Sequence, residues 1–397
     1  MFRKLLVLII TAFIDMVGLL MVLPLMPYYA RDLGAGSLMV TVMVVSFTAA
    51  QLLSAPLWGR FSDKYGRRPA LLVGLGAAAI AYVVFAFATS IWLLLLSRVV
   101  QGLGGGTVGV IQAYVADSTE PQNRAKALGW LSAATNLGVA LGPPIGSVAL
   151  LAGSSGPGLL AAALCVINMA FAWKYLTESR DMVDARDTTK KPRTSKEVIL
   201  RVITHAKETA PRLIWIYAIT MGAFSAITAI LPLFLADQFG VGEQNVWIFF
   251  TYIGVISVVT RAAFLGRMVE HFGEERLSRI GLILLALGLA SYPFVHNYVL
   301  LAIVVALVPL GTAFTFPCVT SLLSRVISSS ERGLYMGVQQ TFGGMSRVVI
   351  PLWAGFSYDQ FGRAIPFLTS AALVLFSLMM NLRIGDRSSD SGDAISR

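Results

Sequence analysis

Charged residues are scarce in this chain. Asp, Glu, Lys and Arg together make up 13% of the 397 residues, whereas hydrophobic residues make up 56%. A soluble globular protein carries roughly a quarter of charged residues, and its interior has too little room for this much apolar surface. The composition therefore excludes a soluble protein and makes lipid the solvent for most of the chain.

Cysteine and histidine are also rare. The two cysteines, Cys165 and Cys318, lie in predicted spans half a chain apart, so neither a disulfide framework nor a zinc site is expected. The three histidines, His205, His271 and His296, fall at loops or at the ends of apolar runs, without the spacing of metal ligands. We predict no metal site and no bound cofactor.

Sequence patterns of enzymes are missing as well. The chain has neither Gly-x-Ser-x-Gly nor His-Glu-x-x-His. The glycine run at 104–106 has no strand before it, so it is not a phosphate-binding loop. A membrane enzyme is therefore not expected, and a scaffold or receptor would not need the embedded acid described below.

Long apolar runs are abundant instead. Residues 38–58, 70–88 and 280–295 are examples close to the ~20 residues that cross a bilayer as a helix. They lack the alternation of barrel strands, so the chain is predicted to be an all-α membrane protein with twelve transmembrane helices. The predicted spans are 5–28, 37–58, 70–89, 91–116, 126–151, 157–176, 212–235, 243–264, 277–295, 298–320, 334–356 and 364–383.

The distribution of basic residues predicts the orientation. The first run follows Arg3 and Lys4 like a signal peptide, but it continues without a cleavage site and is taken as a retained span. The loops opposite the N-terminus hold only Arg31 and Arg363, so both termini are predicted to be cytoplasmic. The loops on the side of the N-terminus hold Arg60, Lys64, Arg67, Arg68, Arg124, Lys126, Arg267, Arg276, Arg325 and Arg332.

The chain divides into two bundles, a linker and a tail. Residues 1–176 and 212–383 form the predicted six-helix bundles, and 384–397 form a disordered cytoplasmic tail. Residues 177–211 are polar and basic and form a cytoplasmic linker. Within it, 195–208 is either a short helix at the anionic inner leaflet or simply a solvated stretch.

An internal repeat relates the two bundles. When one half is slid by roughly 207 positions, glycine, proline and charged positions coincide. The coinciding pairs are Gly59 with Gly266, Asp63 with Glu270, Gly66 with Gly273, Arg124 with Arg332, Gly129 with Gly337, Pro143 with Pro351, and Pro24 with Pro232. Two related six-helix bundles allow a central site to open alternately to either face.

The loop between the second and third spans carries the most specific motif. It reads Gly-Arg-Phe-Ser-Asp-Lys-Tyr-Gly-Arg-Arg-Pro over 59–69 and resembles the signature of the major facilitator superfamily. Arg98 to Gly102 resembles the superfamily's second motif. Asp15, with Gly18, Pro24 and Pro27, resembles the first-span motif of drug/proton antiporters that include tetracycline pumps. The resemblance covers nearly the whole chain and implies the major facilitator fold.

The loop motif predicts a conformational latch. A carboxylate near a helix N-terminus is stabilised by the unpaired N–H groups and the helix dipole. We expect Asp63 to dock near Arg332 and Glu270 to mirror it near Arg124, latching the outward-facing state. The predicted latch residues are Gly59, Asp63, Gly66, Arg67, Arg68, Arg124, Glu270 and Arg332.

The fifth span resembles the antiporter motif of the superfamily. Gly138, Gly142 and Gly146 allow close helix packing, and Pro143 interrupts the backbone ladder, so a bendable helix is expected. Ser147 departs from the motif, which usually has a second glycine there. Plain packing of small residues is the alternative interpretation.

Asp15 is the only carboxylate deep in a predicted span. Burial and a nearby arginine shift the pKa of a carboxylate in opposite directions, so Asp15 is the predicted proton carrier, with Arg98 hydrogen-bonded nearby. A structural ion pair or helix cap is the alternative. The acids that tetracycline pumps carry in the third and ninth spans are missing, which puts tetracycline itself in doubt.

A central cavity for an amphipathic ligand is predicted from polar and aromatic residues in the spans. Arg347 either binds an anionic group of the substrate or pairs with a backbone carbonyl. The predicted cavity residues are Gln51, Gln101, Gln112, Tyr114, Asn136, Phe224, Phe250, Phe314, Gln339, Gln340 and Arg347.

The sequence thus predicts a monomeric secondary transporter of the inner, or plasma, membrane. It would exchange protons for a small amphipathic compound and export it as a drug, without nucleic acid as a partner. A symporter or facilitator for a sugar, an anionic metabolite or a lysolipid is the alternative, and the embedded arginines favour an anionic cargo.

Overall fold

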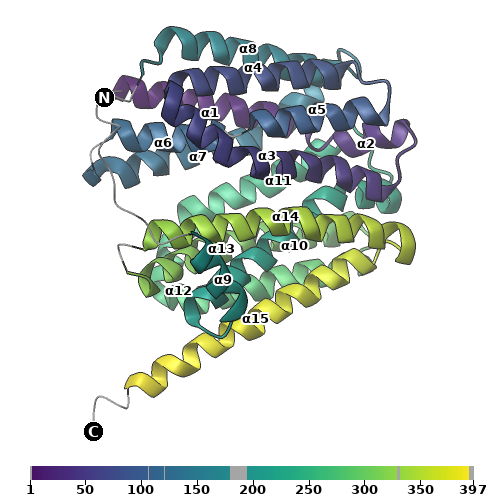
Figure 1. The fold of residues 1–397 in the computed structure, drawn as a ribbon. Helices are drawn as coiled ribbons and strands as arrows, with labels where there is room; N and C mark the ends of the chain where they lie inside the picture. Colours follow the sequence, from purple (N-terminus) through teal and green to yellow (C-terminus); the bar gives the residue numbers. More distant parts are fainter. Residues whose placement is uncertain (1, 106, 120, 179–194, 329–330, 393–397) are drawn as a thin grey trace. The chain divides into compact units, whose positions relative to one another are not determined.

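A computed structural model shows a chain made almost entirely of helices (Figure 1). It describes residues 2–105, 107–119, 121–178, 195–328 and 331–392, and no strand occurs among them. Ten helical segments in these ranges are long and apolar enough to cross a membrane. The prediction of an all-α membrane protein is therefore confirmed.

The six spans predicted in the first half correspond to eight helices. The first span is divided at Pro24, because proline cannot donate a hydrogen bond to the helix ladder, and the fourth is divided after Gly105. The helices are α1 (Phe2–Val22), α2 (Met26–Asp32), α3 (Ser37–Tyr65), α4 (Arg67–Ala86), α5 (Ile91–Gly104), α6 (Thr107–Ser118), α7 (Pro121–Leu150) and α8 (Gly156–Tyr175).

The second half begins with a short helix and continues with long ones. One apolar segment, Val246–Phe294, contains two predicted spans, which are separated by the non-helical Gly273 with φ 75°. The elements are α9 (Ser195–Thr204), α10 (Thr209–Phe239), α11 (Val246–Val259), the π-turn η2 (Thr260–Phe264), α12 (Leu265–Ser291), η3 (Tyr292–Phe294), α13 (Tyr298–Val326), α14 (Arg332–Phe361) and α15 (Ile365–Gly392). The predicted span 334–356 lies in α14 but is not one of the ten segments, because its glutamines and Arg347 lower its hydropathy.

Two compact units divide the chain. Unit 1 contains Met1–Lys190 and Pro232–Gly254, and unit 2 contains Lys191–Leu231 and Val255–Arg397. This division differs from the predicted bundles, because the end of α10 and the start of α11 pack with α2 and α7. Arg31 forms a bidentate ion pair with Asp237, with N–O distances of 2.7 and 2.9 Å. The Tyr28 hydroxyl donates to the Val241 carbonyl at 2.9 Å.

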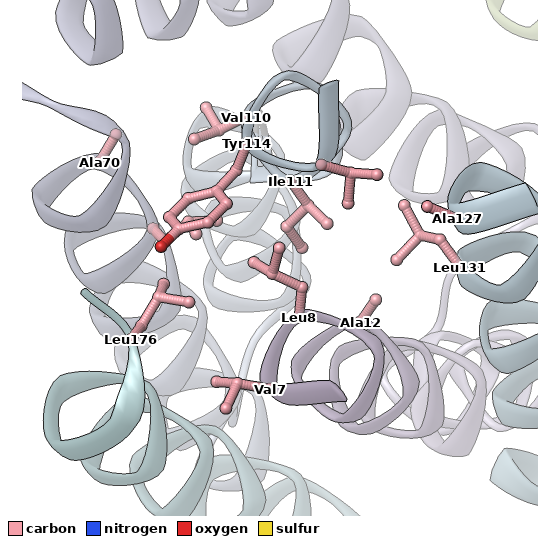
Figure 2. Close-up of a cluster of buried hydrophobic side chains, with 12 residues drawn as sticks. Val7, Leu8, Ala12, Ala70, Val110, Ile111, Tyr114, Ala127, Leu131 and Leu176 are labelled. Carbon is pink, nitrogen blue, oxygen red and sulfur yellow. The ribbon is translucent and has the colours of Figure 1, made fainter. Parts of the chain in front are cut away.

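A core of buried aliphatic side chains holds one end of unit 1 together. Side chains of α1, α4, α6 and α7 meet there with Leu176, which follows α8 (Figure 2). The ring of Tyr114 on α6 points toward Leu176, and its hydroxyl donates to the Thr177 carbonyl (Figure 2). This contact fixes the exit of α8 against α4 and α6, which places the segment that follows it near the loop motif.

The linker and the tail are more ordered than predicted. Within 177–211, α9 buries Val198 and Val202, and the Trp215 indole donates to the Val202 carbonyl at 3.0 Å, so this stretch is not simply solvated. Residues 179–194 lie outside the described part. The predicted disordered tail is helical through Gly392, since a helix begun in an apolar span propagates at one hydrogen bond per residue.

Candidate functional site

Asp15 lies on α1, inside unit 1, and is partly buried. It interacts electrostatically with Tyr82 of α4 and with Cys165 of α8. Close by, a Cβ atom on Gly18 would lie 3.5 Å from the Tyr82 hydroxyl, so the glycine leaves room for that group beside α1. Among the described residues, none forms an ion pair or hydrogen bond with Asp15.

Arg98 on α5 is fully buried. None of its three guanidinium nitrogens has a hydrogen-bond partner within the described ranges, which corrects the prediction of a hydrogen-bonded arginine. Aromatic rings, rather than hydrogen-bond acceptors, face the Arg98 guanidinium. The guanidinium carbon lies 5.3 Å from the Phe85 ring centre and 6.0 Å from that of Tyr82, which is cation–π distance.

Tyr82 connects the acid and the base. No ion pair joins Asp15 to Arg98, but both groups interact electrostatically with Tyr82. The Tyr82 hydroxyl also accepts a hydrogen bond of 2.5 Å from the amide of Gln101, which is one helical turn from Arg98. A partly buried acid and a buried cation thus interact with one hydroxyl-bearing ring.

The loop motif is built around Gly66. This residue has φ 102°, a conformation that suits glycine, and it separates α3 from α4. Glu178 lies directly against it and accepts hydrogen bonds from the main-chain N–H groups of Arg67 at 2.8 Å and Arg68 at 3.1 Å. Asp63 pairs with Arg67 at 2.9 Å across one turn. The motif is therefore a helix corner whose free N–H groups are satisfied by a carboxylate.

The predicted latch partners are placed as follows. Asp63 belongs to unit 1 and Arg332 to unit 2, and the latch between them stays a prediction. Arg332 donates to the Ser324 carbonyl at 3.1 Å, and Glu270 is exposed on α12. The side chain of Arg124 lies outside the described residues.

The corresponding corner of the second half shares the glycine geometry. Gly273, the counterpart of Gly66, also has a positive φ, of 75°. Glu274, which follows it, accepts from Ser321 and from Arg325, each at 2.7 Å. The repeat read from the sequence is therefore present in the backbone, although different side chains hold the two corners.

The small residues of α7 pack directly on α1. A Cβ atom on Gly138 would lie 2.8 Å from the carbonyl of Phe13, one on Gly142 2.9 Å from that of Val17, and one on Gly146 2.4 Å from that of Met21. Each contact is one turn further along both helices, so the two backbones run side by side over these residues. Pro143 lies within this stretch without ending α7.

The predicted cavity residues do not all face open space. Tyr114 and Phe314 are buried in hydrophobic cores, Phe314 with Leu277 and Cys318, so both are packing residues rather than cavity walls. Phe250 and Gln339 are buried too, while Gln112 and Gln340 are exposed. Gln51 donates to the Gly105 carbonyl, Asn136 to that of Ser132, Gln340 to the Tyr217 hydroxyl and Arg347 to the Gly343 carbonyl, and Phe224 packs against Phe316.

Sequence reasoning missed two residues, Glu178 and Tyr82. Glu178 is an acid directly after a span and before a basic linker, a place where a carboxylate meets helix N-termini. Tyr82 offered the signal of a hydroxyl in an otherwise apolar span. Arg261 is one of the embedded arginines that the sequence indicates, but its place in the π-turn η2, a rare feature that often marks functional sites, has no sequence signature.

Comparison with known proteins agrees with this architecture. The chain is 27% identical over 354 residues to the tetracycline resistance protein, class B, of Escherichia coli, covering 88% of this chain and 87% of that protein. It is also 27% identical to multidrug resistance protein 1 of Bacillus subtilis (strain 168), covering 89% of each. The crystal structure of the human organic anion transporter MFSD10 (TETRAN) superposes with a TM-score of 0.71 at 23% identity, covering 96% of this chain and 99% of that one.

Membrane-length helices, a repeated helix corner and a buried acid–base cluster define a multi-pass membrane transport protein rather than an enzyme. The sequence model of the Major Facilitator Superfamily matches residues 8–264 and 261–394. The chain therefore belongs to this superfamily.

Proposed function

We propose that this protein is a proton-driven antiporter that exports small amphipathic compounds, as a drug efflux pump of the inner membrane. The observation that carries the proposal is Asp15, an acid in a membrane span with no protein partner among the described residues and coupled to Arg98 through Tyr82. Relatives named for tetracycline and multidrug resistance support export as the direction.

The proposed cycle follows from this cluster. A proton from outside neutralises Asp15, which removes a negative charge facing Tyr82 and leaves Arg98 as the net charge of the cluster. Because α1 packs on α7, a shift of α1 is carried to α7 and changes which face is open. The proton leaves on the cytoplasmic side, where Asp63, Arg332, Glu270 and Arg124 latch the alternate state. The proton gradient is the energy source, no cofactor takes part, both termini are cytoplasmic and the monomer is the working unit.

The test uses acid-loaded everted vesicles and records proton release on adding lipophilic cations, neutral antibiotics or organic anions. We expect substrate-dependent release by the native protein, loss of it in Asp15→Asn, and retention in Asp32→Asn, which changes an exposed acid at the far end of the same apolar segment, Leu5–Asp32. Release that persists in Asp15→Asn would move the proton site elsewhere. Substrate flux without proton movement would favour a facilitator instead.

A further inference from the structure

Two arginines of unit 2 have no carboxylate partner among the described residues, Arg261 in the apolar segment Val246–Phe294 and Arg347 in the predicted span 334–356. Arg261 is partly buried in η2, its Nε atom is buried without a hydrogen bond, and no described residue bonds to its guanidinium. Arg347 on α14 makes only a long bond of 3.4 Å from Nε to the Gly343 carbonyl. An arginine without an anionic partner is costly inside a bilayer, so such groups usually serve a function.

Tyr217 of α10 links the two arginines. It is the titratable group that interacts electrostatically with Arg261. Its ring packs on Gly343, where a Cβ atom would lie 2.8 Å from the ring, and the carbonyl of the same glycine receives Arg347. Gln340 donates to the Tyr217 hydroxyl at 3.3 Å. Tyr217 therefore interacts with Arg261, accepts a hydrogen bond from Gln340 and packs on the glycine whose carbonyl receives Arg347.

An aromatic wall adjoins this polar group. The Phe316 ring centre lies 5.4 Å from that of Tyr217, and Phe224 lies 6.4 Å from Phe316. Phe316, Phe224 and Arg347 are all partly exposed. The wall offers a flat apolar surface for an aromatic ring, next to cations that need an anion.

The acids on neighbouring α12 are already engaged. Glu274 pairs with Arg325 at 2.7 Å, and Glu275 pairs with Arg279 one turn away. Glu270 is exposed, and among the described residues no ion pair joins it to Arg261. No acid of α12 pairs with Arg261 or Arg347 among the described residues, so an anionic group of a substrate can take that place.

We propose that Arg261 and Arg347, with Tyr217 and Phe316, form a subsite that binds the carboxylate of an aromatic amphipathic substrate. The planar guanidinium fork matches a carboxylate with two parallel hydrogen bonds, which a point charge would not do. The ring of the substrate stacks on Phe316 while its carboxylate meets the arginines. This inference rests on the proposed function and narrows its substrates to aromatic carboxylates and zwitterions.

The experiment uses a rhodamine dye with a free carboxylate and the same dye as its methyl ester. Binding to the purified full-length protein in lipid nanodiscs is followed by fluorescence anisotropy, without any proton gradient. We expect Arg261→Gln to weaken binding of the acid roughly tenfold, since charge-assisted hydrogen bonds contribute about 1.5–3 kcal/mol, and to leave the ester within about twofold. Arg276→Gln removes an exposed arginine elsewhere on α12 and is the control. It should leave the binding of both the acid and the ester unchanged.

Three outcomes overturn the subsite. They are equal weakening of both dyes in Arg261→Gln, undiminished binding of the acid, and displacement of the acid by chloride or phosphate as effectively as by unlabelled aromatic acid, which would assign the arginines to an inorganic ion. If Arg261→Gln does not fold, Arg347→Gln is the second variant. It should likewise weaken binding of the acid and leave binding of the ester nearly unchanged. Export of the ester dye under a proton gradient is scored separately. If that export fails while acid binding stays selective, the proposed antiport fails and the subsite stands.

Discussion

Glu178 caps the N-terminus of α4, because its Oε1 atom accepts a 2.8 Å hydrogen bond from the main-chain N–H of Arg67. The second carboxylate oxygen accepts from Arg68. The first residue after α8 that carries a charge thus closes the corner that the loop motif builds. The loop motif is therefore stabilised by Glu178, a residue outside the motif that lies at the start of the segment leading to unit 2.

Replacing Glu178 should loosen this corner. Glu178→Ala removes both acceptors and is expected to lower the free energy of unfolding by about 1 kcal/mol, the usual effect of losing a helix cap. Glu178→Gln keeps one acceptor oxygen and should fall between. Thermal unfolding in detergent measures the difference, and equal melting temperatures for all three proteins would contradict the cap.

Gly66 should tolerate no side chain. Gly66→Ala places a Cβ atom at a φ of 102° and 2.4 Å from the Glu178 carboxylate, so a loss of roughly 1–2 kcal/mol is expected from the backbone alone. Gly59→Ala is the matched control, since Gly59 is helical with nothing within 4 Å of the added atom. It should be neutral or slightly stabilising. The same melting temperature for both variants would argue against this reading of the motif.

The contact between α1 and α7 can be tested within a single helix. Gly142→Ala brings a Cβ atom to 2.8 Å from that of Leu20 and should cost about 1–3 kcal/mol by overpacking, together with a loss of transport. Gly129→Ala adds the same methyl group on the same helix, where nothing lies within 4 Å. Unfolding and vesicle transport are measured side by side. A larger effect at Gly129 than at Gly142 would rule out the packing argument.

A pH-dependent stability is expected from Glu243, in the loop between α10 and α11. Burial, reinforced by Asp32, raises the pKa of Glu243 above its ordinary value of 4.5. The folded protein then holds a proton that the unfolded chain releases between 4.5 and the raised pKa, so this group's contribution to stability falls as the pH rises through that interval. Glu243→Gln should melt higher than the native protein near neutral pH and equally at the acidic end. A difference independent of pH would refute the assignment.

The sequence predicted the helices well because long apolar runs and glycine–proline punctuation are local signals. The break at Gly273 falls between two predicted spans, whereas the break at Pro24 lies inside a span that was predicted to be continuous. The faces of the helices were harder to predict. Tyr114 and Phe314 were expected in a cavity but are buried in cores, since a span that is apolar all round gives no periodicity to orient it.

For a related reason, the sequence predicted the charged residues of the candidate site but not the contacts between them. Asp15 and Arg98 stand out in sequence because charges in spans are rare. Their link through Tyr82 depends on how α1, α4 and α5 pack, and no spacing along the chain reports that. The same holds for Glu178, which reaches Arg67 across more than a hundred residues of chain.

The interlocked backbones of α1 and α7 have a mechanical consequence. Because α7 contributes no side chain at Gly138, Gly142 and Gly146, its backbone lies directly against α1 and little space is left to absorb a displacement. We expect a displacement of α1, which carries Asp15, to move α7 with it. The hydroxyl of Ser147 on α7 donates to the Gln244 carbonyl at 3.2 Å, so such a displacement would reach the loop that joins α10 to α11.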